Sequence, residues 1–126
     1  MKKSKSGRRK DLNNQFFRSS WEANFARYLN FLKKTKNIYK WEYEPDTFWF
    51  EGIKRGTRSY LPDFKVWDRK NSEPYYYEIK GWMDKKSATQ LKRMAKYYPA
   101  VKIVLIEKLQ YDSIRRQLGR AILQWE

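Results

Sequence analysis

The sequence predicts an α/β fold in which a mixed β-sheet is flanked by helices, in the order α-β-β-β-α-β-α. Apolar residues recur at helical spacing in three stretches, and short aromatic or aliphatic runs typical of strands lie between them. The connection over residues 81–100 is long enough to hold a helix, so the strands on either side of it should be parallel. The earlier strands are joined by short turns and should pair antiparallel.

The first half of the chain contains one predicted helix and a strand-like region that is broken at Pro45-Asp46 and counts as one strand in this order. The helix begins after Ser19 or Ser20, either of which can act as its N-cap. Aromatic runs at residues 38–45 and 47–52 are typical of strands, and a glycine-bearing basic turn follows at residues 52–58. The apolar face of the helix is formed by Trp21, Phe25, Tyr28, Leu29 and Leu32.

The second half of the chain alternates strands and helices. Residues 59–68 and 75–81 predict two strands joined by a turn. Residues 84–98 return to helical spacing and are followed by a proline that ends the helix. A continuous apolar run at residues 100–107 predicts a strand covered on both faces, and a last amphipathic helix is predicted from Asp112.

A chain of 126 residues is long enough for one domain with a single hydrophobic core. Hydrophobic residues make up 40% of the chain and aromatic residues 18%, which is too many for a disordered protein. Residues 1–14 are polar, basic and without periodicity, so they predict a flexible basic arm. We therefore expect a single domain over residues 15–126.

The charge of the chain is strongly positive. It has 29 Lys and Arg against 14 Asp and Glu, for a net charge of +15. Removing the six basic residues found among the first ten from +15 still leaves +9, so the folded part is basic as well. A field of that sign attracts polyanions, and nucleic acid is the commonest one in a cell. A surface that is basic only for solubility is the alternative.

The chain contains neither cysteine nor histidine. Disulfides, cysteine-based zinc sites, thiol nucleophiles and histidine bases are therefore excluded. Any chemistry must rely on carboxylates, lysine, tyrosine and a hard metal ion. Mg²⁺ prefers oxygen ligands and fits this inventory, and Mn²⁺ should substitute for it.

The sequence also predicts where the protein resides. No run approaches the roughly 20 apolar residues of a membrane span. The basic N-terminus is not followed by the apolar stretch of a secretory signal. We therefore expect no membrane contact and a cytoplasmic location.

Two neighbouring predicted strands carry acidic residues where they could meet. Asp63 follows Pro62 on the first strand, and Glu78 and Lys80 lie two residues apart, hence on one face, of the second. If the strands pair through the turn between them, Asp63 and Glu78 can converge. Two carboxylates so placed repel unless a cation lies between them, which predicts a divalent metal site. Lys80 could then orient an attacking water or offset charge in a transition state.

The spacing of an acid and a lysine is by itself a weak signal. The chain contains four such matches, at Asp63-Lys65, Asp68-Lys70, Glu78-Lys80 and Asp84-Lys86. The second lies in a predicted turn, and the fourth lies at a helix start, where an acid is a good cap. Only the pair at residues 78–80 ends an apolar strand, precedes a glycine and follows a strand that carries Pro-Asp.

These residues resemble the motif of the PD-(D/E)xK nuclease superfamily. Pro62-Asp63 lies on one strand and Glu78-Ile79-Lys80 on the next, after a helix that bears Glu22. The predicted order of elements is also similar to the common core of that superfamily, a restriction-endonuclease-like core, over roughly residues 18–107. The small size, the basic surface and the early glutamate look most like its phage and archaeal Holliday-junction resolvases.

The resemblance implies roles for individual residues. Asp63, Glu78 and the carbonyl of Ile79 would bind Mg²⁺, Glu22 would complete the acidic site, and Lys80 would be the catalytic lysine. The implied protein is a metal-dependent endonuclease that cuts branched DNA in a bacterial or phage-infected cell. We expect a homodimer, because symmetric cleavage of a four-way junction needs two sites.

Three groups of basic residues are predicted to hold DNA: the arm, the turn before Asp63 and the helix that follows the site. They comprise Arg8, Arg9, Lys10, Arg55, Arg58, Lys85, Lys86 and Arg93. The aromatic runs at residues 41–43, 48–50 and 75–77 could stack on unpaired bases, or fill a core or a dimer interface. The acids of the first strands, Glu44 among them, are expected to be solvated partners of nearby lysines.

Other interpretations remain open at this point. Glu78 and Lys80 can be an ordinary ion pair, and Asp63 can simply begin a turn. Ser19 and Glu22 have the spacing of a capping box, in which the glutamate does no chemistry. At the level of function, the alternatives are a nicking repair or restriction-type nuclease of the same superfamily, and a non-catalytic basic module that binds nucleic acid.

Overall fold

The central sheet brings together four strands within residues 5–126, the part of the chain that the computed structural model describes. They lie in the order β3 (Lys40–Tyr43), β6 (Phe64–Trp67), β7 (Tyr75–Ile79) and β8 (Ile103–Ile106). β3 pairs antiparallel with β6, and β6 with β7, whereas β7 and β8 are parallel. The mixed sheet predicted from the lengths of the connections is confirmed.

Three helices within the described residues flank this sheet: α1 (Ser20–Lys34), α2 (Lys85–Tyr97) and α3 (Lys108–Leu118). The order α1-β3-β6-β7-α2-β8-α3 follows the predicted order of helices and strands. α3 begins earlier than the predicted Asp112 because Glu107 caps it. No helix in this part of the chain combines the length and the apolar character that a membrane span requires.

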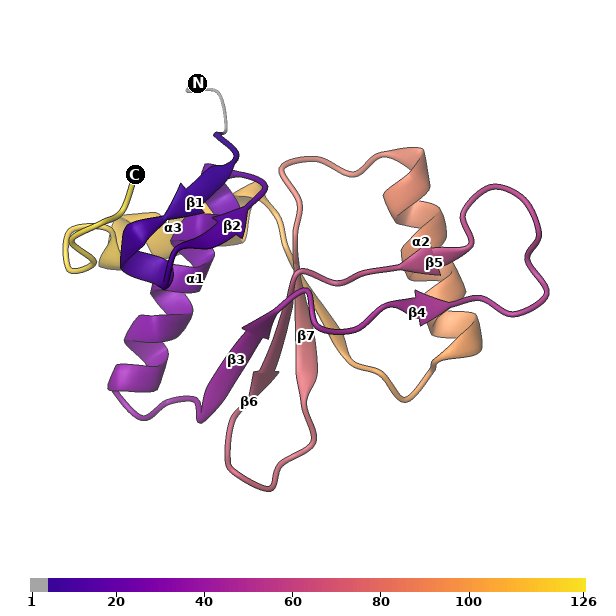
Figure 1. The fold of residues 1–126 in the computed structure, drawn as a ribbon, viewed down its shortest axis with the longest axis horizontal. Helices are drawn as coiled ribbons and strands as arrows, with labels where there is room; N and C mark the ends of the chain where they lie inside the picture. Colours follow the sequence, from indigo (N-terminus) through magenta and orange to yellow (C-terminus); the bar gives the residue numbers. More distant parts are fainter. Residues whose placement is uncertain (1–4) are drawn as a thin grey trace.

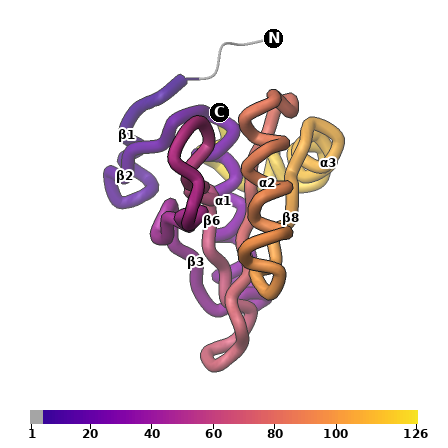
Figure 2. The backbone as a smooth tube through the Cα atoms, turned by 90° about the vertical axis from the view of Figure 1, so that its right-hand side faces the viewer, coloured from indigo at the N-terminus to yellow at the C-terminus, as the bar shows by residue number. Residues whose placement is uncertain are grey.

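Different elements cover the two faces of the sheet (Figure 1). α1 and α3 lie on one side, where the ring of Phe25 contacts those of Phe64 and Tyr77 at centroid distances of 5.3 and 4.9 Å. α2 lies on the other side with a second, small sheet, in which β4 (Phe48–Trp49) pairs with β5 (Ser59–Tyr60). Figure 2 looks onto this side and shows the loop between β4 and β5 beside α2.

One strand prediction is wrong in detail. The run at residues 59–68 is not one strand, because it forms β5 and β6 with a break at residues 61–63. Pro62 has no N–H with which to continue a ladder, so the chain leaves the sheet there. The apolar run that becomes β8 lies at an edge of the sheet, and its two faces are both covered, as predicted. Val104 and Ile106 pack in the main hydrophobic core, and Ile103 packs against a second hydrophobic cluster formed by Phe50, Tyr60 and Met94.

An ordered β-hairpin replaces the flexible arm that was predicted for residues 1–14. β1 (Gly7–Arg9) pairs with β2 (Gln15–Phe17), and the short helix η1 (Lys10–Leu12) lies between them. The side chain of Leu12 is 5% exposed and belongs to the main hydrophobic core. The first four residues of the predicted arm lie outside the described residues. The folded domain therefore includes most of the segment that the sequence assigned to an arm.

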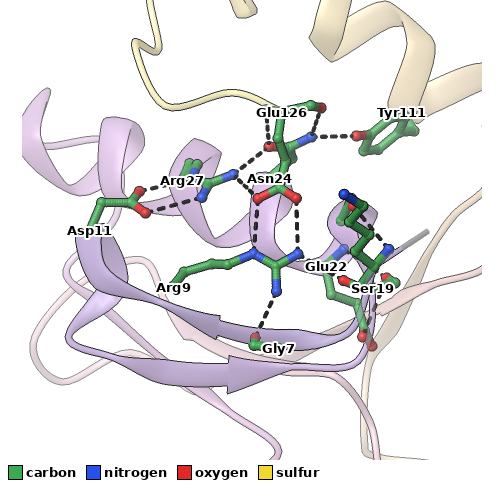
Figure 3. A network of polar contacts seen from close by, with 11 residues as sticks. Gly7, Arg9, Asp11, Ser19, Glu22, Asn24, Arg27, Tyr111 and Glu126 are labelled. Carbon is green, nitrogen blue, oxygen red and sulfur yellow. Dashed lines mark hydrogen bonds and ion pairs between the residues drawn. The ribbon is translucent and has the colours of Figure 1, made fainter. Parts of the chain in front are cut away.

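Polar contacts fasten this hairpin to α1 and to Glu126 (Figure 3). Arg27 is buried and forms ion pairs of 2.8 Å with both Asp11 and Glu126. Asn24 donates to the carbonyl of Glu126 at 2.8 Å and accepts from Arg27 at 2.8 Å. Arg9 pairs with the Glu126 carboxylate at 2.9 Å and also donates to hairpin carbonyls. Arg9 was predicted to bind nucleic acid, and we assign it to the fold instead.

This network predicts a pH-dependent contribution of Glu126 to stability. Its hydrogen bond from Arg9, with help from Arg27, lowers the pKa of Glu126 from 4.5 to about 2. A carboxyl group with a depressed folded pKa stabilises the fold above its unfolded pKa and loses that effect as the pH falls through the folded value. We expect Glu126→Gln to lower Tm at neutral pH, and expect the difference from the parent to vanish between about pH 4.5 and pH 2. Thermal unfolding followed by circular dichroism measures both.

Glu42→Gln is the matched control. The Glu42 side chain is 48% exposed and forms a 3.9 Å ion pair with Lys40, so its loss should change Tm little. Equal losses in the two variants, or a deficit in Glu126→Gln that persists at pH 2, would contradict the role given to the network.

Candidate functional site

One pocket of about 520 Å³ contains the acidic residues predicted from the sequence. It lies where the start of α1, the start of β6 and the end of β7 meet the β4–β5 hairpin and the start of α2. We call it the acidic pocket. The predicted metal-binding and catalytic residues all line it: Glu22, Asp63, Glu78, Ile79 and Lys80.

Asp63 lies at the break between β5 and β6 and is 9% exposed. Its carboxylate accepts a hydrogen bond of 2.7 Å from the backbone N–H of Ile79, on the neighbouring strand. Its backbone carbonyl accepts one of 2.8 Å from the N–H of Glu44. Because Pro62 turns the chain out of the ladder, the Asp63 side chain points across to the end of β7 instead of along the sheet. Asp63 therefore does more than begin a turn.

Pro62 also affects the carbonyl of Ile79, because it cannot donate a ladder hydrogen bond to that carbonyl. β6 and β7 pair with Phe64 opposite Tyr77, so the same register, continued along both strands, places Pro62 opposite Ile79. Proline has no N–H to donate, and the N–H of Ile79 is already taken by Asp63. The Ile79 carbonyl thus lacks its ladder donor from the opposite residue, which suits a metal ligand.

Glu78 lies near the end of β7 and Lys80 directly follows that strand, and both line the acidic pocket. Glu78 is 7% exposed, and its carboxylate accepts a hydrogen bond of 3.1 Å from the hydroxyl of Tyr60. Lys80 is half-buried, and its backbone N–H extends the parallel ladder by donating to Ile106 at 2.9 Å. Burial raises the pKa of Glu78 to about 7, although the nearby Lys80 charge lowers it. The pair is therefore not an exposed surface ion pair.

Glu22 enters the pocket from the first turn of α1 and is 6% exposed. Its backbone N–H donates to the Ser19 side chain at 3.1 Å, which is the helix-capping half of the predicted capping box. Its carboxylate accepts from the hydroxyls of Tyr43 at 3.3 Å and Ser19 at 3.4 Å. Capping thus uses the backbone of Glu22 and leaves its carboxylate facing the other acids.

Burial makes it costly for these carboxyl groups to be charged together. Burial raises the pKa of Glu22, and raises that of Asp63 well above its usual value, with the charges of Glu78 and Glu22 adding to the effect on Asp63. The raised pKa values mean that the ionised forms of these groups are disfavoured. A cation in the pocket would offset the accumulation of negative charge.

The donor set fits a hard divalent cation. Within residues 5–126 no three acidic side chains form a ready-made cage of metal ligands. Mg²⁺ does not need one, because it is usually held by one or two carboxylates, with waters and substrate phosphate completing an octahedron. Asp63, Glu78 and the Ile79 carbonyl supply oxygen ligands of that kind. A cation in this place would also relieve the repulsion that burial makes costly.

The predicted DNA-binding residues take different positions around the pocket. Arg58 and Lys86 are exposed and line it. Arg55, in the same loop as Arg58, and Lys85, next to Lys86, are exposed but do not line it. Arg93 is half-buried and donates to the carbonyl of Thr57, so it holds the β4–β5 loop in place, a role that the sequence did not indicate. The hairpin carries the remaining two, Arg8 and Lys10, both exposed.

Arg18 and Glu44 were missed by the sequence analysis as pocket residues. They form an ion pair of 3.0 Å at the pocket wall, where the Arg18 side chain is 65% exposed and that of Glu44 17%. Glu44 has a φ of 47°, a left-handed conformation that is uncommon outside glycine. Glu44 was expected to be solvated and paired with a lysine, which is wrong. No local pattern reveals this position, since only the fold brings β3 and α1 together here.

The repulsion in the pocket predicts that neutralising Asp63 stabilises the protein when no metal is present. Asparagine has nearly the same shape and can still accept from the N–H of Ile79. We expect Asp63→Asn to raise the free energy of unfolding at pH 7 in EDTA, because burial and the neighbouring charges make an ionised Asp63 costly and the amide carries no charge. Chemical denaturation measures it.

Asp68→Asn serves as the comparison, because Asp68 is an exposed acid at the far end of β6. Its neutralisation should change stability by less than about 0.5 kcal/mol. An Asp63→Asn variant that is less stable than the parent in EDTA would mean that the buried carboxylate is held by favourable contacts and not strained by its neighbours.

Comparison with family models, with curated proteins and with solved structures finds no match to this chain. No relative therefore supplies a function or a ligand for the acidic pocket. The chemistry of Asp63, Glu78, Glu22 and Lys80, and the charge around them, are the grounds on which a function can be argued.

Proposed function

We propose that this protein is a Mg²⁺-dependent endonuclease that hydrolyses phosphodiester bonds in DNA. The observation that carries the proposal is the meeting of Asp63, Glu78, Glu22 and Lys80 in one pocket of a chain with a net charge of +15. Buried carboxylates suit a divalent cation, and the cationic side chains of Arg58 and Lys86 on the wall of the same pocket suit a phosphate backbone. A site for a metal ion and a surface for the phosphate backbone, which metal-assisted phosphodiester hydrolysis requires, are thereby both supported.

The proposed mechanism assigns one task to each residue. Asp63, Glu78 and the Ile79 carbonyl would hold the metal ion. Glu22, which lines the same pocket, would complete the acidic site around it. When bound, Mg²⁺ would supply an acidified water and a positive charge for the phosphate oxygens. The ammonium group of Lys80 would orient the attacking water and offset negative charge as it develops on the phosphate.

The finer assignment is a structure-selective Holliday-junction resolvase with the restriction-endonuclease-like core of the PD-(D/E)xK superfamily. It is supported by the order of elements, by the Pro62-Asp63 break and by the place of Glu78 and Lys80 at the end of the following strand. Since one chain offers one acidic pocket and a four-way junction is cut on two strands, the proposal includes a homodimer.

A cleavage assay tests the proposal. The purified protein is incubated with Mg²⁺ and a four-way junction, a plain duplex or single-stranded DNA. We expect cleavage of the junction at symmetric positions, and a loss of about a hundredfold or more in rate for Lys80→Ala with unchanged DNA affinity, because Lys80 acts on the reacting phosphate. Gel analysis of the end-labelled strands gives rates and positions.

Lys70→Ala is the matched control, since Lys70 belongs to the acid-x-lysine match in the turn after β6. This variant should cleave the four-way junction at the same rate as the parent. Equal cleavage of all three substrates would remove junction selectivity and keep the nuclease, as expected for a nicking repair or restriction-type enzyme. No cleavage by the parent, with any of these substrates, would contradict the nuclease itself.

The second candidate is a non-catalytic basic module that binds nucleic acid. It is favoured by the raised pKa of Asp63, which burial causes and which disfavours the charged form, and by the absence, within the described residues, of a preformed three-carboxylate metal cage. A ligand that binds only the folded state stabilises it by about 2.7 kcal/mol at one hundred times its Kd. The nuclease therefore predicts that Mg²⁺ raises Tm for the parent and for Asp68→Asn, but not for Asp63→Asn.

Calorimetry or a thermal-shift assay over a Mg²⁺ series measures this stabilisation. If Tm stays constant across the series while DNA binding weakens with salt, the protein is the binding module and the acidic pocket holds no metal.

A further inference from the structure

We propose that Trp49 is a stacking platform for an unpaired nucleobase next to the phosphate in the acidic pocket. This inference rests on the proposed function and deepens it, because it names the substrate class: DNA with an unstacked base at the cut, such as a fork, a flap or a junction. Trp49 lines the acidic pocket, yet 57% of its surface is exposed.

Alternation along β4 explains why this indole faces outward. Phe48 packs its ring against those of Tyr76 and Tyr98 at centroid distances of 5.4 and 5.0 Å. Phe50 is 2% exposed and belongs to the second hydrophobic cluster. The residue between them must therefore point away from that cluster. The core fixes the direction of Trp49 without covering its ring.

The backbone that carries Trp49 is held by the helix behind it. The hydroxyl of Tyr98, at the C-cap of α2, donates to the carbonyl of Trp49 at 2.6 Å. Gln90 of α2 donates to the carbonyl of Ser59, the residue that pairs with Trp49, at 3.0 Å. Arg93 donates to the carbonyl of Thr57 in the same loop. An aromatic surface presented on a fixed backbone loses little conformational freedom when a base stacks on it.

The neighbours of Trp49 match the other parts of a nucleotide. Arg58 lies on the same hairpin and on the same pocket wall, and its guanidinium suits a phosphate. The pocket volume of about 520 Å³ lies in the range of sites for small molecules, so it can accept part of a strand. A base inside a continuous duplex is covered by its neighbours and presents no free face. Only an unpaired, splayed base can use Trp49.

The experiment compares DNA binding by the parent and by Trp49→Ala. The probes are a forked DNA with single-stranded arms and an uninterrupted duplex of equal length, each measured by fluorescence anisotropy in Mg²⁺. The parent should prefer the fork. Trp49→Ala should lose about 5-fold to 100-fold in affinity for the fork, the range for stacking of one base on an aromatic ring, and little for the duplex.

Two variants and one spectroscopic signal separate stacking from a general loss of binding. Trp49→Phe keeps an aromatic face and should retain most of the preference for the fork. Tyr39→Ala, which removes an aromatic side chain that is 45% exposed just before β3, should bind both probes like the parent. A 2-aminopurine at the branch point should be quenched by the parent and by Trp49→Phe, but not by Trp49→Ala.

The inference is overturned if the parent binds both probes equally, if Trp49→Ala weakens both to the same extent, or if the 2-aminopurine signal does not depend on Trp49. Because binding and fluorescence are read without cleavage, these outcomes are distinct from a failure of the nuclease proposal. A protein that prefers the fork through Trp49 but never cuts it would retain the stacking platform and lose the endonuclease.

Discussion

Buried carboxyl groups that share one pocket repel one another, and much of the local structure around Glu22, Asp63 and Glu78 offsets that repulsion. The hydroxyl of Tyr60 donates to Glu78, that of Tyr43 donates to Glu22, and the N–H of Ile79 donates to Asp63. Burial and the charges of Glu78 and Glu22 nevertheless raise the pKa of Asp63 well above its usual value. Such an arrangement is costly in a protein that only needs to be stable, because apolar residues of similar volume would pack there without penalty. A pocket of this kind is instead expected where a cation and an anionic substrate are to be bound.

The rest of the fold keeps the walls of this pocket in place through contacts that do not involve the carboxylates of Glu22, Asp63 and Glu78. On one side, Arg27 and Glu126 tie the N-terminal hairpin to α1, and the aromatic core beneath α1 fixes the position of Glu22. On the other side, the side chains of α2 hold the β4–β5 hairpin through its carbonyl groups. The left-handed conformation of Glu44 adds strain at the pocket wall, which persists only where the surroundings determine it. The contacts that stabilise the fold are thus different from the contacts among the acidic residues of the pocket.

The sequence predicted what depends on local periodicity and failed where contacts between distant segments decide. Helical spacing located α1 and α2, and alternation along β7 correctly placed Glu78 and Lys80 on one face. The hairpin was missed because Leu12 is a single apolar residue among polar ones, and its burial depends on Phe17 and on α1. For the same reason Arg9 looked like a free cation. Pro62 signalled a disturbance of the strand, but its consequences for Asp63 and Ile79 follow only from the register of β6 and β7. Arg18 and Glu44 are far apart in the chain and carry no motif.

Whether a divalent ion binds among these carboxylates can be observed directly. Crystals of the protein grown near neutral pH and soaked in Mn²⁺ would give anomalous difference density for the ion. The proposed site predicts one strong peak in contact with oxygen atoms of Asp63 and Glu78 and with the carbonyl of Ile79, and no such peak in crystals of Asp63→Asn. An empty pocket in the soaked parent, or manganese bound only at other acids of the surface, would contradict the metal site and the hydrolytic function built on it.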